Sequence, residues 1–457
     1  MPHLTAAILS IGDELTLGQA LDTNSQWLSR RLTELGIMPI EHAAVADDLA
    51  AIRNAILRLC SRADLLLITG GLGPTADDLT RAALAAAMNE SLVEDADAIG
   101  QISAWFASRA RSMPALNRVQ AQRPASATMI PNQWGTAPGL HALLNPNRDR
   151  QGAESARPPN APDPARTVDI YSLPGPPREM RPMFEASVLP SLKPARLIRT
   201  RALLTFGLGE SEIATRLGDL MDRHRNPTVG TTASQGVVAC RIRFETPDTS
   251  PEAAAAADQA IADIEFRIRA VIGPYIFGAD SDTQSSVILD LLKTRNQTLA
   301  TVESCTGGLL GQLITETPGS SAIYRGGFIT YTNELKQRLV GVPAEVFAPG
   351  GPGAVSRECA ESMARGGLRT ANADHALAIT GIAGPDGGSP DKPVGTVWIA
   401  LASKGNGDPN PATVRSRRFL FTPDRANIRD WSARSALAML RFALINEPEL
   451  RILRQAD

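Results

Sequence analysis

Short apolar runs alternate with amphipathic helical patterns near the N-terminus, and this alternation is the strongest constraint on the fold. The apolar run at 6–11 precedes a helical pattern at 24–36, and a second helical pattern at 49–63 precedes the run DLLLITGG. The runs are apolar at successive positions, so both faces of each strand should be covered, as in a parallel sheet flanked by helices. The pattern therefore predicts an α/β domain with a parallel or mixed sheet.

The pattern changes twice along the 457 residues, a length that suggests about two to four domains. A smaller segment contains a half-buried strand pattern, GVVACRIRFET, and an Ala-rich helical stretch at 251–272. The α/β alternation resumes after a linker near 278–284. We predict three domains, at 1–189, 190–277 and 284–457, with strands of the last near 299–303, 326–332, 375–381 and 394–402.

Residues 144–167 interrupt the first domain. They are rich in Pro, Asn, Arg and Asp and poor in apolar residues, which predicts an exposed, mobile insertion. The strand-like run VDIYSL follows them, so the insertion should lie inside the domain.

Charge and cysteine content argue against several classes of protein. A formal net charge of −2 gives no general attraction to nucleic acid or to an anionic membrane. The four cysteines are far apart and lack the spacing of a zinc site or a disulfide framework. The apolar run at 6–11 is too short to span a membrane. We therefore expect a cytoplasmic protein with neither nucleic acid nor membrane as partner.

Three acidic pairs follow the strand-like runs of the first segment. Ligands of an open parallel sheet bind beyond the carboxyl ends of its strands, so the pairs should face one crevice. The turn GGLGPT allows backbone N–H groups to approach an anion, and carboxylates beside such a turn indicate a Mg²⁺-type ion. Alternatively, the acids only cap helices. The candidates are Asp13, Glu14, Asp47, Asp48, Gly70, Gly71, Gly73, Thr75, Asp77, Asp78 and Thr80.

The stretch TVESCTGG places Ser304 at a predicted strand-to-helix turn, where a helix N-terminus favours developing negative charge. A nucleophilic serine needs a base, and His375 is assigned a structural role at the start of a strand. Lysine can act as a base where burial lowers its pKa. With a helix starting near Asn333, Tyr331 and Lys336 would face one pocket and relay a proton from Ser304. The alternative is a tyrosine at a strand end and a lysine on a solvated helix face.

Cys305 is the rival nucleophile, because a helix N-terminus lowers the pKa of a thiol. Side chains alternate along a strand, so Ser304 and Cys305 should point to opposite sides, and we favour Ser304. A second glycine-rich turn, AITGIAGPDGG, offers donors for a phosphate or carboxamide, and an arginine beyond it can bind a phosphate bidentately. The substrate-binding candidates are Thr306, Gly307 and Gly308 at the helix start, Thr380, Gly381 and Gly384 in the second turn, and Arg425.

Long motifs over nearly the whole chain, apart from 144–167, resemble the CinA family (competence/damage-inducible protein A). SIGDELTLGQALDTNSQWLSRRL, ITGGLGPTADDLT, GTAPGL and LPGPPREM resemble its N-terminal part, which is similar to the molybdopterin-binding domain of molybdenum-cofactor biosynthesis proteins. TFGLGESEIATRL and NPTVGTTASQGVVACRIR resemble its KH-like middle domain. ESCTGG, GGFITYTNELK, ITGIAGPDGG and KPVGTVW resemble its C-terminal domain.

The resemblance implies two hydrolytic activities. For the N-terminal domain it implies divalent-metal-dependent hydrolysis of ADP-ribose to AMP and ribose 5-phosphate, with Asp47 and Asp78 at the matching positions. Leu72 stands where cofactor-synthesis proteins usually carry Thr, which removes one hydroxyl from a pterin site. For the C-terminal domain it implies metal-independent deamidation of nicotinamide mononucleotide (NMN) to nicotinic acid mononucleotide and ammonia. Ser304 is then the nucleophile, Lys336 and Tyr331 its activating partners, and Thr380 and Arg425 substrate-site residues.

The middle domain lacks the GxxG loop flanked by basic residues that a KH module uses to bind nucleic acid. We therefore expect a spacer or dimerisation domain, and a homodimer. The alternative function is a binding or regulatory protein that holds a molybdopterin-like ligand in a degenerate N-terminal site.

Overall fold

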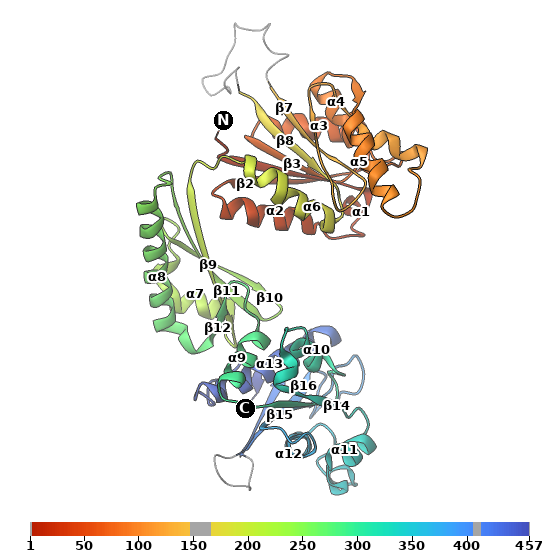
Figure 1. Cartoon of the computed structure of the whole chain (residues 1–457). Helices are drawn as coiled ribbons and strands as arrows, with labels where there is room; N and C mark the ends of the chain where they lie inside the picture. The colour runs from red at the N-terminus through yellow and green to blue at the C-terminus, as the bar shows by residue number, and fades with distance from the viewer. Residues whose placement is uncertain (1, 147–165, 405–412, 457) are drawn as a thin grey trace. The chain divides into compact units, whose positions relative to one another are not determined.

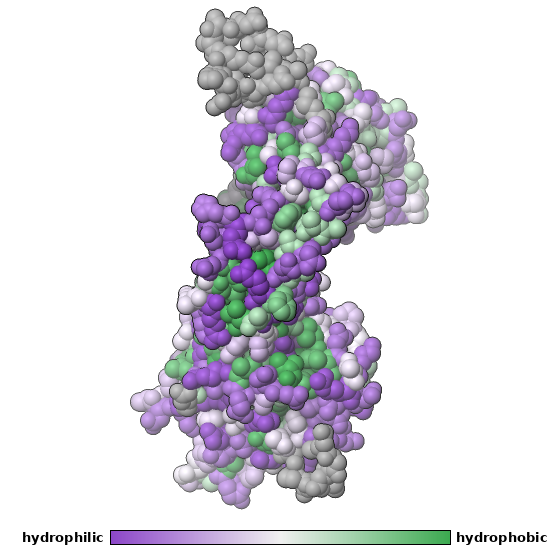
Figure 2. All heavy atoms as spheres, turned by 90° about the vertical axis from the view of Figure 1, so that its left-hand side faces the viewer, coloured by the Kyte–Doolittle hydropathy of each residue, from purple (hydrophilic) through white to green (hydrophobic). Residues whose placement is uncertain are grey.

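The computed structural model describes residues 2–146, 166–404 and 413–456. The chain divides into two compact units, Met1–Arg199 with Glu245–Asp258, and Thr200–Phe244 with Gln259–Asp457. The predicted insertion lies mostly outside the described residues, although Leu144 is the last residue of a strand. No helix in the described ranges has the length and apolar character needed to cross a membrane. On the face drawn in Figure 2, hydrophilic residues predominate and hydrophobic ones gather in patches between them.

A six-stranded mixed sheet with helices on both faces forms the first unit (Figure 1). Ile8 belongs to a core with Leu28 of one helix, whereas its neighbour Leu9 belongs to a second core with Ile56 of another. Helices therefore cover both faces, which explains the continuous apolar runs. The strand order is β2(Met38–Val45)-β1(Thr5–Ile11)-β3(Leu65–Thr69)-β8(Val168–Leu173)-β7(Gly139–Leu144)-β6(Thr128–Ile130), parallel from β2 to β8 and antiparallel beyond. The helices are α1(Asp13–Thr16), α2(Thr23–Glu34), α3(Leu49–Cys60), α4(Thr80–Met88), α5(Ala96–Ala107) and α6(Pro177–Met183), and β4(Leu92–Glu94) pairs with β5(Gln122–Pro124).

The middle region is a four-stranded sheet with two helices. Phe206 of the sheet lies in one core with Ile213 of the first helix and Ile268 of the second. The second helix has the predicted bounds, Pro251–Ile272. The strand order is β10(Thr228–Ser234)-β11(Val237–Thr246)-β9(Leu197–Phe206)-β12(Ile276–Ala279), and the helices are α7(Glu210–Leu217) and α8(Pro251–Ile272).

The C-terminal region repeats the half-parallel design. Val302 packs in a core with Met363 of α12 on one face of the sheet, and Leu299 lies in a core with Leu437 of α13 on the other. The order is β14(Tyr324–Ile329)-β13(Leu299–Glu303)-β15(His375–Gly381)-β16(Thr396–Ser403)-β17(Thr413–Leu420)-β18(Gln455–Ala456), parallel from β14 to β15 and antiparallel beyond. The helices are α9(Gln284–Thr294), α10(Leu309–Thr315), α11(Asn333–Val340), α12(Arg357–Thr370) and α13(Arg425–Leu444).

Two predicted boundaries in this region are wrong. The strand expected at 326–332 ends at Ile329, because Thr332 accepts a hydrogen bond from the Leu335 N–H and caps α11. The helix expected to start within CTGG begins only at Leu309. Gly307 and Gly308 have φ values of 59° and 98°, which a right-handed helix does not allow. Five residues, from Ser304 to Gly308, therefore separate Glu303 from the helix.

Gly366 allows α12 to pack closely on the end of α11, because a Cβ there would lie 1.8 Å from the Val340 carbonyl oxygen. We predict that Gly366→Ala lowers the free energy of unfolding by about 1–3 kcal/mol. Gly100 of α5 is the matched control: a Cβ there meets nothing within 4 Å. Gly100→Ala should raise stability by about 0.5–1 kcal/mol through helix propensity. Urea denaturation checks both, and equal effects would contradict the packing argument.

Candidate functional site

A cavity of about 280 Å³ lies beyond the carboxyl ends of β13, β14 and β15. Three loops that follow these strands supply most of its wall, and α11, α13 and the segment before α12 supply the rest. The structure thus unites segments that are far apart in the sequence, as expected for the edge of a parallel sheet. The predicted residues that line it are Ser304, Cys305, Tyr331, Lys336, Thr380, Gly381, Gly384 and Arg425.

Ser304 and Lys336 are in direct contact. The Lys336 Nζ donates to Ser304 Oγ at 3.1 Å and to the Thr330 carbonyl oxygen at 2.8 Å. Helix α11 starts at Asn333, as predicted, and turns Lys336 inward so that only 1% of it is exposed. Burial lowers the pKa of the Lys336 ammonium, because desolvation disfavours the charged form. The alternative of a lysine on a solvated helix face is therefore wrong, and the pair has the geometry of a nucleophile and its base.

The start of α10 is occupied by Glu303, which the sequence analysis did not select. Its carboxylate is 2% exposed and accepts N–H groups of Gly308 at 2.9 Å, Leu310 at 3.0 Å and Gly311 at 2.9 Å. The Gly307 N–H donates to the Ser304 carbonyl oxygen. The available signal was an acidic residue at the end of the strand, just before the predicted helix start, since negative charge is favourable at a helix N-terminus.

The prediction that Thr306, Gly307 and Gly308 bind substrate is therefore wrong. The N–H groups of both glycines are already used inside the turn. Thr306 is buried, and its carbonyl oxygen accepts Nε and Nη2 of Arg429, a second residue that the sequence analysis missed. These contacts make the turn rigid behind Ser304 instead of offering donors to a ligand.

Cys305 is a buried thiol in the core beside the pocket. Desolvation raises the pKa of Cys305 to about 12, although Lys336 opposes the shift. The expectation that the helix start lowers the pKa of this thiol is wrong, because Glu303 occupies that helix start. A neutral thiol is a poor nucleophile, which favours Ser304.

Tyr331 and Arg425 form one side of the pocket mouth. Arg425 donates from Nη1 to the Gly384 carbonyl oxygen at 2.7 Å and from Nη2 to the Tyr331 hydroxyl at 3.1 Å. Tyr331 is 56% exposed. The hydrogen bond found for the Tyr331 hydroxyl thus joins it to the proposed phosphate-binding residue and not to Ser304, so the predicted proton relay through Tyr331 lacks a contact in the described residues.

Thr380 and His375 both hold β15 in place. Thr380 is buried and donates to the Ala354 carbonyl oxygen at 2.7 Å. His375 bonds to Ser403 and Gln297, and burial lowers the pKa of His375 to about 4. His375 therefore stays neutral and has the structural role expected from the sequence.

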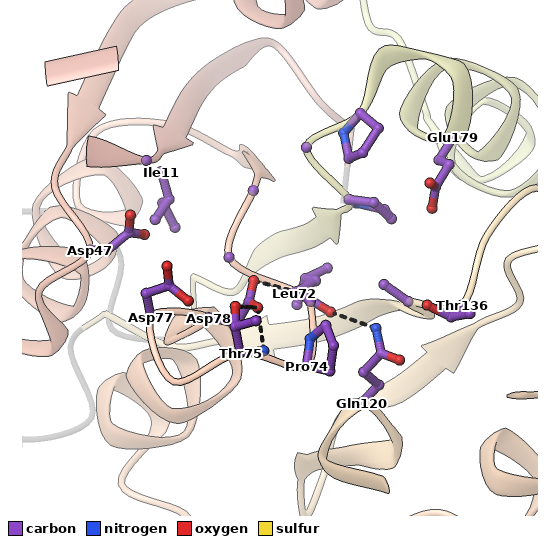
Figure 3. A pocket seen from close by; sticks show the side chains of 18 of the residues that line it. Ile11, Asp47, Leu72, Pro74, Thr75, Asp77, Asp78, Gln120, Thr136 and Glu179 are labelled. Carbon is purple, nitrogen blue, oxygen red and sulfur yellow. Dashed lines mark hydrogen bonds between the residues drawn. The ribbon is translucent and has the colours of Figure 1, made fainter. Parts of the chain in front are cut away.

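A second pocket, of about 350 Å³, lies beyond the carboxyl ends of β1, β3 and β8 (Figure 3). The acidic pairs contribute unequally to it. Asp13 and Asp48 do not line it, and Thr80 lies behind the glycine loop, where its Oγ1 donates to the Gly70 carbonyl oxygen. The predicted residues that do line it are Glu14, Asp47, Gly70, Gly71, Gly73, Thr75, Asp77 and Asp78.

Asp78 and Arg81 fix the glycine loop from two sides. Asp78 accepts the Gly73 N–H at 2.6 Å and both the N–H and hydroxyl of Thr75. Arg81, buried and missed by the sequence analysis, donates to the carbonyl oxygens of Leu72 and Gly73. The carbonyl groups are thus satisfied from behind. Within the described residues, the N–H groups of Gly71 and Leu72 make no hydrogen bond, so they suit an anion.

Asp47 lies among other acids. Its Oδ2 accepts the Asp13 N–H at 3.0 Å, and the Asp47 N–H donates to Asp13 Oδ1 at 3.1 Å. Burial, and then the charges of Asp13, Asp77 and Glu14, raise the pKa of Asp47. Crowded carboxylates favour a cation between them. Asp48, by contrast, accepts the Ala51 N–H and caps α3, as the alternative reading held.

A divalent metal fits Asp47 better than Asp78. Both oxygens of Asp78 are used to hold the loop, whereas Asp47 Oδ1 accepts no hydrogen bond from the described residues. Among those residues, no group of three or more His, Cys, Asp or Glu side chains is placed to hold a metal ion. Mg²⁺ commonly takes one or two carboxylates and completes its shell with phosphate oxygens and water, so this donor set suits a metal that binds together with a phosphorylated ligand.

Comparison with known proteins agrees with this three-part structure. Models of the probable molybdopterin binding domain, the damage-inducible protein CinA KH domain and the CinA C-terminal domain match residues 7–194, 200–278 and 281–444. A "putative competence-damage inducible protein" of Symbiobacterium thermophilum is 40% identical over 450 residues, covering 97% of this chain and 99% of that protein. The chain belongs to the CinA family.

Other CinA relatives support the assignment. A "CinA-like protein" of Synechococcus sp. is 39% identical over 97% of this chain and 99% of its own length. A crystal structure of a competence/damage inducible protein from Agrobacterium tumefaciens is 40% identical and covers 35% of this chain and 93% of that chain, with a TM-score of 0.32. The domain models and the full-length relatives confirm the resemblance read from the motifs at the level of family and domains.

Burial of Lys336 predicts a pH-dependent cost to stability. Because its pKa is lower in the folded than in the unfolded chain, the unfolded chain binds the extra proton, and the cost is complete below the folded pKa. The cost disappears as pH rises through the ordinary pKa of lysine. Lys336→Met should therefore gain stability relative to the parent as pH falls.

Urea denaturation of the parent and of Lys336→Met at several pH values measures this difference in the free energy of unfolding. The control is Lys392→Met, because Lys392 makes an exposed contact. The same pH dependence in both variants, or none in Lys336→Met, would contradict the buried-ammonium argument.

Proposed function

We propose that this CinA-family chain hydrolyses two nucleotides of pyridine metabolism. The C-terminal domain deamidates NMN to nicotinic acid mononucleotide and ammonia, and the N-terminal domain hydrolyses ADP-ribose to AMP and ribose 5-phosphate. The observation that carries the first activity is the 3.1 Å hydrogen bond between the buried Lys336 and Ser304. The pocket of free loop N–H groups and crowded acids supports the second.

The Ser304–Lys336 pair can perform amide hydrolysis in two stages. Neutral Lys336 takes the hydroxyl proton as Ser304 Oγ attacks the amide carbon, and then gives that proton to the leaving ammonia. An acyl ester on Ser304 remains. Lys336 next takes a proton from water as the water attacks the ester, and returns it to Ser304 Oγ when nicotinic acid mononucleotide leaves. The bond of Lys336 Nζ to the Thr330 carbonyl oxygen holds the amine in place through both stages.

The phosphate of NMN is assigned to Arg425. The start of α10 cannot bind it, because Glu303 already occupies those N–H groups. The Arg425 guanidinium lines the same cavity as Ser304 and is oriented by Gly384 and Tyr331. A guanidinium suits a phosphate because it offers paired donors in a plane. Tyr331 then serves as a positioning residue for Arg425.

In the N-terminal domain, the glycine loop binds the diphosphate of ADP-ribose through the Gly71 and Leu72 N–H groups. Asp47, with phosphate oxygens of the substrate, would hold Mg²⁺ or a similar ion. When bound, such an ion neutralises charge on the diphosphate. Asp78 and Arg81 keep the loop in its binding conformation.

The rival function is a binding or regulatory protein with a molybdopterin-like ligand in the N-terminal pocket. The same loop would hold the phosphate of such a ligand, so the loop alone does not separate the two. Turnover does. We also propose that the protein acts as a homodimer with nucleotides as its small-molecule partners, which sedimentation analysis tests.

Ser304→Ala is predicted to reduce ammonia release from NMN by at least about a thousandfold, because no other group supplies the nucleophile. Cys305→Ser is the matched control and should keep activity within about tenfold, since the Cys305 thiol is neutral and buried. A coupled ammonia assay without added metal measures both. Activity that survives Ser304→Ala and disappears in Cys305→Ser would reverse the assignment.

AMP release from ADP-ribose is predicted to require a divalent metal. Asp47→Asn should lower it by about a hundredfold or more, as expected when one electrostatic stabiliser is lost. The neighbouring Asp48→Asn is the control, because Asp48 caps α3 outside the pocket. Chromatography of the products with Mg²⁺ and with EDTA measures both. If neither chelation nor Asp47→Asn lowers turnover, the metal assignment is wrong, and if no AMP forms at all, the binding function gains.

A further inference from the structure

Glu179 is a carboxylate in the N-terminal pocket that the mechanism above does not use. It lies in α6, beyond β8, and is 8% exposed. It nevertheless lines the cavity. Figure 3 shows it on the opposite side of the pocket from Asp47 and Asp77, near Thr136. The pocket therefore has two chemically different ends, one with the glycine loop and crowded acids and one with a single buried carboxylate.

The surroundings of Glu179 are built to hold this carboxylate. Asn132 Nδ2 donates to Glu179 Oε2 at 2.9 Å and is itself held by the Ala137 carbonyl oxygen. Gly135 leaves the necessary space, because a Cβ there would lie 1.8 Å from Glu179 Oε2. The segment WGTAPG thus packs its backbone against the carboxylate, and a larger residue at 135 would displace it.

One oxygen of Glu179 remains available to a ligand. Among the described residues, the carboxylate has no lysine, arginine or histidine within 4.0 Å, and its only side-chain hydrogen bond is the one from Asn132 to Oε2. Oε1 therefore has free acceptor capacity in a residue that lines the cavity. A largely buried carboxylate oxygen without a donor is costly, so a ligand that excludes water from this end must supply a donor.

Either a metal ion or an uncharged N–H group could bind this oxygen, and the neighbouring side chains indicate which of the two fits. Thr136 lines the same end and is neutral, which does not favour a second metal ion beside a lone carboxylate. An uncharged N–H group on a flat heterocycle fits this end, with the phosphate of the same ligand on the glycine loop.

We propose that Glu179 recognises the heterocycle of the nucleotide by accepting a hydrogen bond from its exocyclic amino group. This inference rests on the proposed ADP-ribose hydrolysis, whose substrate carries the 6-amino group of adenine. Glu179 then acts as a specificity-determining residue. It selects nucleotides with an N–H donor on the base and disfavours those without one, because its oxygen would be left unpaired.

The test compares ADP-ribose with the analogue that carries hydrogen in place of the 6-amino group. The parent should prefer ADP-ribose by about 10- to 100-fold in kcat/KM, the range of a hydrogen bond to a charged group. In Glu179→Ala the preference should fall to about one. Glu179→Met, which has similar volume and no strong acceptor, gives the same reading if the alanine variant fails to fold. The control is Glu185→Ala, because Glu185 pairs with Arg31 and does not line the pocket.

A binding measurement separates this inference from the hydrolysis on which it rests. Calorimetry in the presence of Mg²⁺ measures the Kd of AMP and the Kd of purine riboside 5′-monophosphate, which lacks the 6-amino group. The ratio of the two Kd values gives the preference for the amino group without any hydrolysis. If the parent releases no AMP from ADP-ribose, the hydrolysis is wrong, and the Kd ratio still tests Glu179. A parent ratio near one, or a ratio that Glu179→Ala leaves unchanged, overturns the inference.

Discussion

Both candidate sites depend on one constraint: the carboxyl ends of neighbouring parallel strands lie at the same end of the sheet. In the N-terminal domain β1, β3 and β8 meet at such an end, and in the C-terminal domain β13, β14 and β15 do. Each sheet becomes antiparallel beyond this group, at β7 and at β16. Loops that follow strands far apart in the sequence therefore meet at the parallel half, and each pocket lies beyond it.

At the C-terminal site, two buried ionisable side chains, Glu303 and Lys336, have opposite kinds of surroundings. Glu303 receives three backbone N–H groups, which replace the water that its carboxylate lost on burial. Lys336 receives no carboxylate within 4.0 Å in the described part of the chain, and its partners are a hydroxyl and a carbonyl oxygen. The fold thus stabilises the anion and leaves the cation ready to lose its proton. A serine beside an amine whose pKa is lowered is one arrangement that can activate a nucleophile.

Periodicity and motif position were enough to predict several strands and helices and the main residues of one pocket. The roles of residues that act through their hydrogen-bond partners were missed. The sequence located β13, β15 and α8 at their observed bounds and brought Ser304, Lys336 and Arg425 to one pocket. The helix start expected within CTGG is wrong for a physical reason, because positive φ at Gly307 and Gly308 delays the helix. Glu303, Arg81 and Glu179 were missed because their roles follow from which backbone groups they reach, and that depends on the tertiary structure.

In the proposed function the two sites bind a phosphate by different means, and the local charges explain why. At the C-terminal site the helix start is closed by Glu303, so a positive side chain, Arg425, must supply the attraction. At the N-terminal site the loop N–H groups are open, but Asp47, Asp77 and Glu14 surround them with negative charge. A phosphate approaching that loop is repelled unless a cation lies between it and the acids. The carboxylates repel an anion that arrives alone. They therefore favour, in the proposed site, a phosphate that binds together with a metal ion.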